Sequence, residues 1–411
     1  MKDDFEIELT SMAHGGAAVG RQGGRAVFVP YALPGERVRA RITQDKERFA
    51  YAETVEILTR SGARVEPPCP HFGPGRCGGC HWQHIDYAHQ LEFKRAVVVD
   101  QLERVGRLRS PVVHPTLPSP SPWGYRAYLT LTPTPDGRLG IVGDDNRQVI
   151  PVDVCHILHP ALAELLGQLD LEGLPARRIR LQVGSDPTDR MVILEVEGDN
   201  APEVMVRLPI SVNLLTGDNE PINLIGSPHV TYHVAGRDFR VTAGGFFQVN
   251  PPVVEALVKE VMRRLDLRGE ESVLDLYSGV GLFTAFIAAR AAFVTSVESY
   301  PPAVTDADAN LADFDNVDLL EGSVEAVLDD LEDPFDAVVV DPPRTGLGPQ
   351  VTARLARLGA ARIVYVSCDP ATFARDAAKL AESGYRLVDV QPVDMFPQTY
   401  HVECVATLER R

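Results

Sequence analysis

The chain has 411 residues, of which 45% are hydrophobic, and its formal net charge is −17. This length is enough for two or three domains with cores of their own, and the composition is that of a globular protein. No long apolar run is present, and the first residues, MKDDFEIELT, are unlike a signal peptide. We therefore expect a cytoplasmic monomer without a membrane partner. The negative charge disfavours nucleic-acid binding over the whole surface, but it does not exclude a local basic face.

The first 60 residues alternate apolar and polar positions between Gly and Pro turns, as in RAVFVPYALPGERVRARI. This pattern predicts a small antiparallel β-barrel. Between Arg21 and Arg48, seven basic residues stand against three acidic ones, interleaved with Phe28, Tyr31 and Phe49. Such a face suits phosphates and stacked bases. An ordinary solvent-exposed strand surface fits the same residues equally well, so both interpretations stay open here.

Residues 61–240 begin with three cysteines within twelve positions and continue as short strands broken by Pro and Gly. This pattern indicates an α+β middle region, in which helical spacing predicts a helix at about 91–108. Six cysteines in a chain of this length are too few for a disulfide scaffold. Clustered thiols in a reducing compartment more often bind metal or perform chemistry.

From residue 241 onward, strands and helices alternate along the chain. We expect strands at 272–276, 293–297, 335–340, 362–366, 385–391 and 401–408, and helices at 282–290, 302–312 and 371–382. This alternation is typical of a parallel, doubly wound sheet, in which ligands bind beyond the carboxyl ends of the strands.

Two features after the first strands of this region suit a nucleotide. VLDLYSGVGLFT places Gly279 and Gly281 where a backbone without Cβ can approach a cofactor closely. The next strand ends at Glu298, about 20 residues further on, where a carboxylate can accept hydrogen bonds from ribose hydroxyls. Together these features predict an adenosine-containing cofactor, although a strand-end carboxylate can equally be a solvated cap.

Two later strands end in residues that suit chemistry at the same edge. Asp341 precedes two prolines in VVVDPPRTG, which hold a rigid loop. Cys368 follows the next strand and precedes a helix, whose dipole is expected to favour the thiolate. A lone cysteine is more often a buried structural residue, but the strand-end position favours a chemical role.

These motifs resemble those of the S-adenosylmethionine-dependent RNA 5-methyluridine methyltransferases. SCDPATFARD is similar to the S-C-N-P-A-T-x-x-R-D signature of that family, and GGFFQVNP, LDLYSGVGLFT, DPPRTG and DMFPQTYHVE are similar to its other motifs, in the same order. The resemblance implies three domains. They are a TRAM-like RNA-binding β-barrel at 1–60, an α+β central domain with a 4Fe-4S segment at 61–240, and an α/β Rossmann-like class I methyltransferase domain at 241–411, on which the helix at about 91–108 is expected to pack.

The resemblance also implies roles for particular residues. Cys368 is the expected nucleophile and Glu403 the expected base. S-adenosylmethionine is expected to contact Gln248, Tyr277, Glu298 and Asp341, and a 4Fe-4S cluster is expected on Cys69, Cys77, Cys80 and Cys155. The C-x7-C-x2-C spacing is two residues longer than usual in the family, and zinc is the alternative for four thiols. Asp369 replaces the usual Asn beside the nucleophile, which is expected to raise the pKa of the thiol.

The implied reaction is methylation of carbon-5 of one uridine in RNA through a covalent Cys–uracil adduct. The uridine is expected in a loop or single strand, and ribosomal RNA is expected ahead of transfer RNA as the target. One alternative is a non-enzymatic RNA-binding protein with a degenerate methyltransferase domain, but both Cys368 and Glu403 are present. The other is a DNA cytosine methyltransferase, in which the thiol follows a Pro in an earlier loop.

Overall fold

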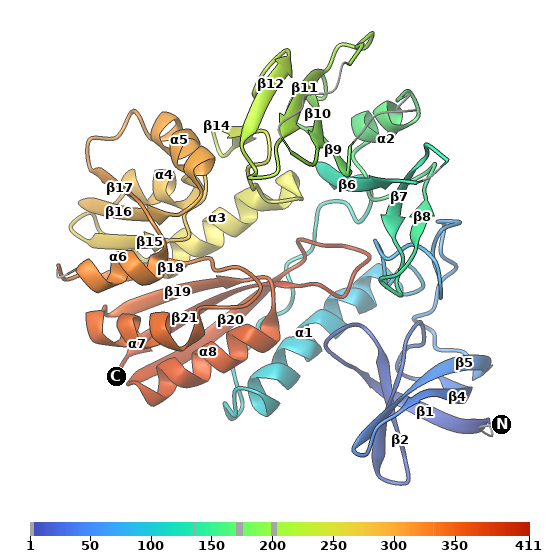
Figure 1. The fold of residues 1–411 in the computed structure, drawn as a ribbon. Helices are drawn as coiled ribbons and strands as arrows, with labels where there is room; N and C mark the ends of the chain where they lie inside the picture. Colours follow the sequence, from blue (N-terminus) through green and yellow to red (C-terminus); the bar gives the residue numbers. More distant parts are fainter. Residues whose placement is uncertain (1–3, 135, 170–175, 199–203, 332) are drawn as a thin grey trace.

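A computed structural model describes residues 4–134, 136–169, 176–198, 204–331 and 333–411 of the chain (Figure 1). Within these residues the chain forms a closed five-stranded barrel, a seven-stranded sheet, a two-stranded ribbon and a second seven-stranded sheet. No helix among them is both long and apolar enough to cross a membrane.

The N-terminal barrel has the strand order β1-β2-β3-β5-β4. Its strands are β1 (Phe5–Met12), β2 (Ala18–Gln22), β3 (Arg25–Val29), β4 (Arg37–Asp45) and β5 (Phe49–Thr59). Alternate residues such as Ile7, Val27 and Val38 fill its interior. The predicted barrel is therefore confirmed, with one difference: β3 and β5 pair in parallel. An odd number of strands cannot close a barrel with every neighbouring pair antiparallel.

The middle of the chain forms a sheet with the strand order β12-β11-β10-β9-β6-β7-β8. Its elements are β6 (Tyr128–Pro133), β7 (Leu139–Val142), β8 (Val149–Pro151), α2 (Pro160–Leu166), β9 (Arg178–Val183), β10 (Arg190–Glu195), β11 (Ser211–Leu215) and β12 (Pro221–Ile225), and the ribbon of β13 (His229–Val234) and β14 (Arg237–Thr242) follows. One continuous apolar core joins Leu181 of this sheet, Tyr232 of the ribbon and Val364 of the C-terminal sheet. The middle and C-terminal regions therefore stabilise each other.

The C-terminal sheet has the strand order β17-β16-β15-β18-β19-β21-β20. Its elements are α3 (Pro251–Leu265), β15 (Ser272–Leu276), α4 (Leu282–Ala288), β16 (Phe293–Glu298), α5 (Pro301–Asn310), β17 (Val317–Glu321), α6 (Val324–Asp330), β18 (Ala337–Val340), α7 (Gly348–Leu358), β19 (Arg362–Ser367), α8 (Pro370–Glu382), β20 (Tyr385–Val393) and β21 (Glu403–Arg410). The first five strands in the order are parallel. β21 is antiparallel to both of its neighbours, so the expected all-parallel sheet is mixed.

The predicted long helix is α1 (Tyr87–Arg104), which begins four residues earlier than expected. Asp86 caps it by accepting a hydrogen bond from the backbone N–H of Ala88. α1 contacts α8 and β20, and it runs between the barrel and the C-terminal sheet (Figure 1). Its buried face includes Gln90 and Lys94, two polar residues that are unusual in a helix core.

Candidate active site and cysteine cavity

Glu298 is held at the end of β16 by backbone amides. Its carboxylate accepts hydrogen bonds from the N–H groups of Gly279 at 2.9 Å, Ser299 at 2.7 Å and Tyr300 at 2.8 Å. One of these amides belongs to the glycine turn after β15, so the carboxylate ties two neighbouring strand ends together. The predicted acid and the predicted turn thus lie at one edge of the sheet.

The glycine turn is shaped by backbone conformations that few residues adopt. Gly281 caps α4 at φ 83°, and a Cβ there would lie 3.0 Å from Cδ1 of Leu311. Tyr277 has φ 62°, which is uncommon for a residue with a side chain. Such conformations are often found at ligand sites, where the surrounding structure maintains them. Gln248, the other predicted cofactor residue, is buried.

Two further carboxylates lie close to this turn. Asp275 is fully buried within β15, where its carboxylate accepts a 2.6 Å hydrogen bond from Thr284 Oγ1. Its Oδ1 has no hydrogen-bond partner among the residues that the structure describes. Burial raises the pKa of Asp275 to about 7. Burial, followed by the charge of Asp275, also raises the pKa of Asp341 to about 7. The sequence prediction included Asp341 but missed Asp275, although a lone acid in the apolar run SVLDL was a usable signal.

The predicted nucleophile and base lie next to each other because of the β19–β21 ladder. This ladder pairs Ser367 with Cys404, so Cys368, which follows Ser367, and Glu403, which precedes Cys404, are neighbours across the two strands. Glu403 is buried, and its Oε1 has no hydrogen-bond partner among the described residues. Side chains alternate along a strand, so Cys404 points away from Glu403 and into an apolar cluster.

The acid–thiol pair is kept in its protonated state by burial. Burial, together with the charges of Glu403 and Asp341, raises the pKa of Cys368 to about 12, and Arg344 opposes this shift. Burial likewise raises the pKa of Glu403 well above its usual range, an effect that Asp341 increases and Arg344 opposes. Burial therefore keeps the thiol of Cys368 protonated in this state of the protein, and the expected effect of the helix dipole stays a prediction. Asp369 does raise the pKa of Cys368 as expected, but its effect is the smallest.

Asp369 itself caps the helix that follows the thiol. Its Oδ1 accepts hydrogen bonds from the backbone N–H groups of Ala371 at 2.9 Å and Thr372 at 3.0 Å. His14, from the turn between β1 and β2, reaches Oδ2 of Asp369 at 3.4 Å. The barrel therefore contacts the residue next to the predicted nucleophile, and the carboxylate of Asp369 accepts hydrogen bonds from the first free amides of α8.

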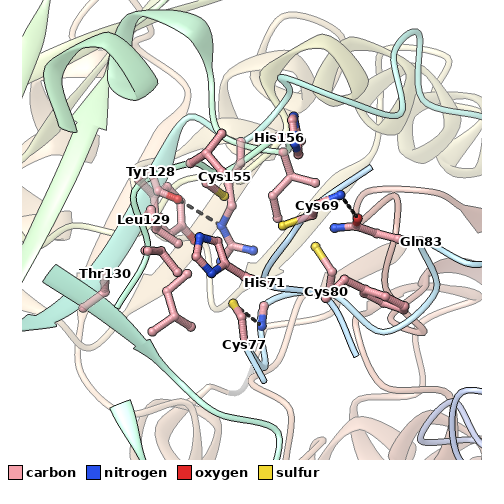
Figure 2. Close-up of a pocket in the computed structure, with 17 residues that line it drawn as sticks. Cys69, His71, Cys77, Cys80, Gln83, Tyr128, Leu129, Thr130, Cys155 and His156 are labelled. Carbon is pink, nitrogen blue, oxygen red and sulfur yellow. Dashed lines mark hydrogen bonds between the residues drawn. The ribbon is translucent and has the colours of Figure 1, made fainter. Parts of the chain in front are cut away.

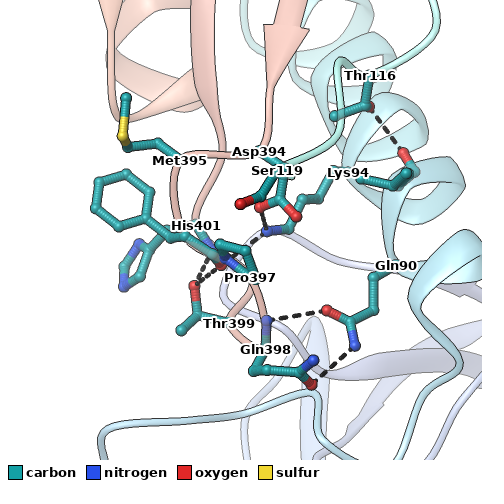
Figure 3. Close-up of polar contacts among 12 residues, drawn as sticks. Gln90, Lys94, Thr116, Ser119, Asp394, Met395, Pro397, Gln398, Thr399 and His401 are labelled. Carbon is teal, nitrogen blue, oxygen red and sulfur yellow. Dashed lines mark hydrogen bonds and ion pairs between the residues drawn. The ribbon is translucent and has the colours of Figure 1, made fainter. Parts of the chain in front are cut away.

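Residues 394–401 form the loop that leads to Glu403, and α1 anchors this loop through polar side chains (Figure 3). Lys94 Nζ donates to Oδ1 of Asp394 at 2.5 Å and to the carbonyl oxygen of Phe396 at 2.9 Å. Gln90 Nε2 donates to Oε1 of Gln398 at 3.0 Å, and the backbone N–H of Gln398 donates back to Gln90 Oε1 at 3.1 Å. The Lys94–Asp394 ion pair is fully buried.

The four cysteines of the predicted cluster line one cavity of about 190 Å³ (Figure 2). They are Cys69, Cys77, Cys80 and Cys155, and none of them forms a disulfide. The cavity is bordered by β6 residues and by His71. Within the described parts of the chain, no three His, Cys, Asp or Glu side chains are arranged to hold a metal ion. The donor chemistry thus fits a soft metal or an iron–sulfur cluster, whereas the present spacing of the thiols does not form a coordination shell.

The predicted basic face of the barrel is largely neutralised. Each arginine of β4 is paired with an acid on the same surface: Arg37 with Glu6, Arg39 with Glu56, and Arg41 with Asp4 and Glu53. All of these side chains are at least 30% exposed. Of the two interpretations, this strand therefore fits the solvent-exposed surface better than a phosphate-binding stripe.

Comparisons with known proteins agree with this architecture. The tRNA (uracil-5-)-methyltransferase family profile matches residues 229–411, and the TRAM domain profile matches residues 4–55. An uncharacterized RNA methyltransferase of Streptomyces avermitilis is 39% identical over 429 residues, which cover 100% of this chain and 99% of that protein. An RNA methyltransferase of Halalkalibacterium halodurans, also described as uncharacterized, is 33% identical over 452 residues, which cover 99% of this chain and 97% of that protein.

A solved structure extends the comparison to three dimensions. Pyrococcus abyssi tRNA (uracil-54, C5)-methyltransferase in complex with S-adenosyl-L-homocysteine has a TM-score of 0.76 and 27% identity, covering 98% of this chain and 100% of that one. The fold, the TRAM barrel and the relatives together define an RNA methyltransferase. The chain belongs to the tRNA (uracil-5-)-methyltransferase family. The predicted family, the TRAM domain and the enzymatic class are therefore confirmed, and a non-enzymatic RNA-binding protein is not supported.

Proposed function

We propose that this enzyme transfers a methyl group from S-adenosylmethionine to carbon-5 of a uridine in RNA through a covalent adduct with Cys368. The observation that carries the proposal is the position of a strand-end thiol beside the buried Glu403, whose Oε1 has no hydrogen-bond partner in the part of the chain that the structure describes. A thiol and a carboxylate that lie side by side and both have a raised pKa suit covalent catalysis followed by proton removal.

The cofactor would lie against Gln248, Tyr277, Glu298 and Asp341. Glu298 is immobilised by three backbone amides at the strand end from which a carboxylate binds ribose hydroxyls. Asp275 and Asp341 add two acidic groups, and a cationic cofactor would favour their ionised forms. The Pyrococcus abyssi relative was solved with S-adenosyl-L-homocysteine, which supports the same assignment.

The proposed reaction uses Cys368 in its first step and Glu403 in its last. The Cys368 thiol and the Glu403 carboxyl group first lose their protons to solvent. The thiolate then adds to carbon-6 of uracil, so that the C5–C6 double bond becomes an enolate. Carbon-5 then attacks the methyl carbon of the sulfonium, and the C–S bond breaks to release S-adenosylhomocysteine. Glu403 removes the proton that remains on carbon-5, and the electron pair reforms the double bond as the thiolate leaves.

The pKa shifts fit these roles. A buried thiol with a pKa of about 12 reacts little until a substrate and its neighbours favour the thiolate. Arg344 lowers the pKa of both Cys368 and Glu403, so it is the cation that favours the two ionised forms. A carboxylate with a raised pKa is also a stronger base once it has lost its proton.

The test is to remove the two groups separately. Cys368→Ala should abolish methylation and leave only reversible RNA binding. Glu403→Gln should still allow attack and methyl transfer, so methylated RNA should stay bound to the protein through denaturing electrophoresis. The double variant should form no adduct, which separates covalent trapping from tight binding. A stable adduct with Cys368→Ala, or no adduct in either single variant, contradicts the assignment.

The class of RNA that the enzyme methylates is identified by mapping 5-methyluridine in cellular RNA. Ribosomal RNA is the target expected from the sequence, whereas the Pyrococcus abyssi relative is named for uracil-54 of tRNA. We would map 5-methyluridine in both RNA classes from cells that lack the protein and from cells that regain it. Loss and return of the modification at a ribosomal uridine supports ribosomal RNA as the target. The same result at a uridine of transfer RNA makes transfer RNA the target instead.

The cysteine cavity would hold a 4Fe-4S cluster on Cys69, Cys77, Cys80 and Cys155. Four free thiols from two distant segments line this one cavity, which is the donor set that such clusters use. A bound cluster would supply a structural link between these segments. Elemental analysis of anaerobically purified protein should find about four irons and four sulfides per chain. Zinc without sulfide supports the alternative metal.

A further inference from the structure

We propose that a cleft beside the active site binds an unpaired RNA base that neighbours the target uridine. This inference rests on the proposed function and names a second contact of the same substrate. The cleft, called the junction cleft below, has a volume of about 520 Å³. It is lined by the barrel turn at 15–17, the cysteine segment at 78 and 81, the hairpin turn at 141–144, and residues 400–401 of the loop before β21.

The junction cleft adjoins the proposed chemistry because of its place in the chain. His401 lines the cleft and lies two residues before Glu403, the proposed base. The same loop is anchored to α1 by Lys94 and Gln90 (Figure 3). A strand whose uridine enters the active site would therefore pass this cleft with an adjacent nucleotide.

The walls of the cleft are aromatic. The Tyr400 ring centroid lies 4.5 Å from that of His81 and 4.3 Å from that of His401. Single-stranded nucleic acids bind proteins largely by stacking their bases on such rings, at about 1–3 kcal/mol per base in general. Burial lowers the pKa of His401 to about 3, with Arg344 adding to the shift, so this imidazole is a neutral stacking surface.

The polar edge of the cleft favours a base over a phosphate. Oδ2 of Asp144 accepts hydrogen bonds from Tyr31 Oη at 2.9 Å and from the backbone N–H of Gly75 at 3.2 Å. Within the described residues, its Oδ1 has no such bond and can accept one from the exocyclic amino group of adenine, cytosine or guanine. A carboxylate at this position would repel a phosphate, so the backbone of the RNA should remain outside.

The barrel completes the cleft through a close approach that requires glycine. A Cβ at Gly16 would lie 2.7 Å from Cδ1 of Tyr400, and the carbonyl oxygen of Gly16 accepts a 3.1 Å hydrogen bond from Trp82 Nε1. The TRAM barrel is thus packed directly on the ring that we assign to base stacking. This contact gives the barrel a part in base recognition that does not depend on its arginines.

The test uses two RNA heptamers with a single uridine at the centre, adenines elsewhere, and 2-aminopurine either before or after that uridine. Stacking quenches 2-aminopurine fluorescence, so wild-type protein should quench one of the two probes on titration. Tyr400→Leu keeps apolar bulk against Gly16 but removes the ring, and it should weaken the apparent affinity about tenfold. Tyr400→Phe should bind like wild type. Phe293→Leu is the matched control, because Phe293 is an exposed aromatic residue at the start of β16. It should leave the affinity for both probes unchanged.

A second variant tests the polar edge without changing the rings. Asp144→Ala should reduce the preference for a flanking adenine over a flanking uridine, measured as the ratio of the two affinities. Equal quenching by wild type and Tyr400→Leu, or no quenching of either probe by wild type, overturns the proposal. Methylation of RNA by the wild-type protein is measured separately with labelled cofactor. Quenching without methylation therefore contradicts the proposed reaction, whereas methylation without Tyr400-dependent quenching contradicts the base subsite.

Discussion

Charged residues behave differently on the barrel and at the edge of the C-terminal sheet. On the barrel, Arg37 and Arg39 are exposed and each is paired with a nearby acid. At the sheet edge, Asp275 and Glu403 are buried, and each has a carboxylate oxygen without a hydrogen-bond partner in the described part of the chain. The exposed arginines of the barrel form ion pairs in water, and such a pair contributes about 0–1 kcal/mol to the free energy of unfolding.

The difference shows which charges are available for function. An exposed pair keeps its ordinary protonation state and presents little net charge to a ligand. Burial shifts the pKa of a carboxylate toward neutrality, as at Asp275, and such a group can exchange a proton or meet a cation. Counting charged residues in the sequence therefore overestimates the role of the barrel strand and underestimates that of β15. The following four experiments test this comparison.

The largest effect is expected where a buried charge loses its partner. Lys94→Met leaves Asp394 buried and unpaired, which should lower the free energy of unfolding by about 3–5 kcal/mol. The double variant Lys94→Met with Asp394→Leu should recover part of this loss. Urea titration followed by fluorescence measures both. Lys259→Met, which breaks an exposed pair with Glu255, is the matched control and should cost less than about 1 kcal/mol. Equal losses for the two lysines would contradict the comparison.

The next effect concerns pH and the cofactor. Below a pH of about 7, Asp275 and Asp341 are mainly protonated, and above it they ionise. A cation favours the ionised form, so the affinity for S-adenosylmethionine should rise with pH up to about 7 and level off above, by about tenfold per pH unit if one proton is released. Calorimetry between pH 5.5 and 8.5 measures this.

Two substitutions of aspartate by asparagine test whether Asp341 causes the pH dependence of cofactor affinity. Asp341→Asn removes one of the titrating groups and should flatten the pH dependence of cofactor affinity. Asp318→Asn, at an exposed position of β17, should leave the wild-type profile in place. A flat profile for the wild-type protein would show that neither buried carboxylate meets the cofactor.

A smaller effect is expected from the cation beside the thiol. Arg344 lowers the pKa of Cys368, so Arg344→Gln should reduce the thiolate fraction and slow alkylation of Cys368 by iodoacetamide several-fold at pH 8. Peptide mass spectrometry follows the modification of this one cysteine. Arg357→Gln, an exposed change in the last turn of α7, should alkylate at the wild-type rate. Faster alkylation of Cys368 in Arg344→Gln would show that Arg344 does not lower the pKa of this thiol.

The smallest effect is expected on the barrel. Changing Arg37, Arg39 and Arg41 together to Ala should weaken RNA binding less than about threefold, because their charges are already paired. The slope of log affinity against log salt should change by less than one. Lys46 and Arg48, for which no ion pair is found among the described residues, provide the comparison, and their double change to Ala should have the larger effect. A strong loss in the triple variant would restore the phosphate-binding interpretation of β4.

The sequence predicted the elements that follow a clear local pattern. The barrel strands, the glycine turn and the strands that end at Glu298 and Ser367 are found within a few residues of their expected positions. Such elements depend on apolar alternation and on Gly or Pro turns, which can be identified in a single sequence. In the C-terminal region, strand β17 and helices α3, α6 and α7 were missed. β17 and α6 fall in an acidic stretch and α7 in a Gly- and Pro-flanked one, where these signals are weak, whereas the regular apolar spacing of α3 was a usable signal.

The remaining features depend on contacts between distant segments. The Lys94–Asp394 pair joins residues 300 positions apart, and no local pattern indicates it. The insertion of β21 between β19 and β20 is a choice of pairing partner that alternation does not specify. The raised pKa of Cys368 depends chiefly on burial, which the position before a helix does not indicate.

The position of the proposed base is set by the register of β21, and this register has a weak hydrophobic signal. Both faces of β21 are buried from Glu403 to Thr407, so a slip of one residue would still bury apolar groups while replacing Glu403 with Cys404. Arg264 fixes the register instead: it donates to Thr407 Oγ1 at 2.7 Å and pairs with Asp389 of β20. A molecule in which β21 is shifted by one residue would therefore be compact but inactive. Loss of Arg264 should appear as a smaller fraction of titratable active sites, with normal turnover in the molecules that remain correctly paired.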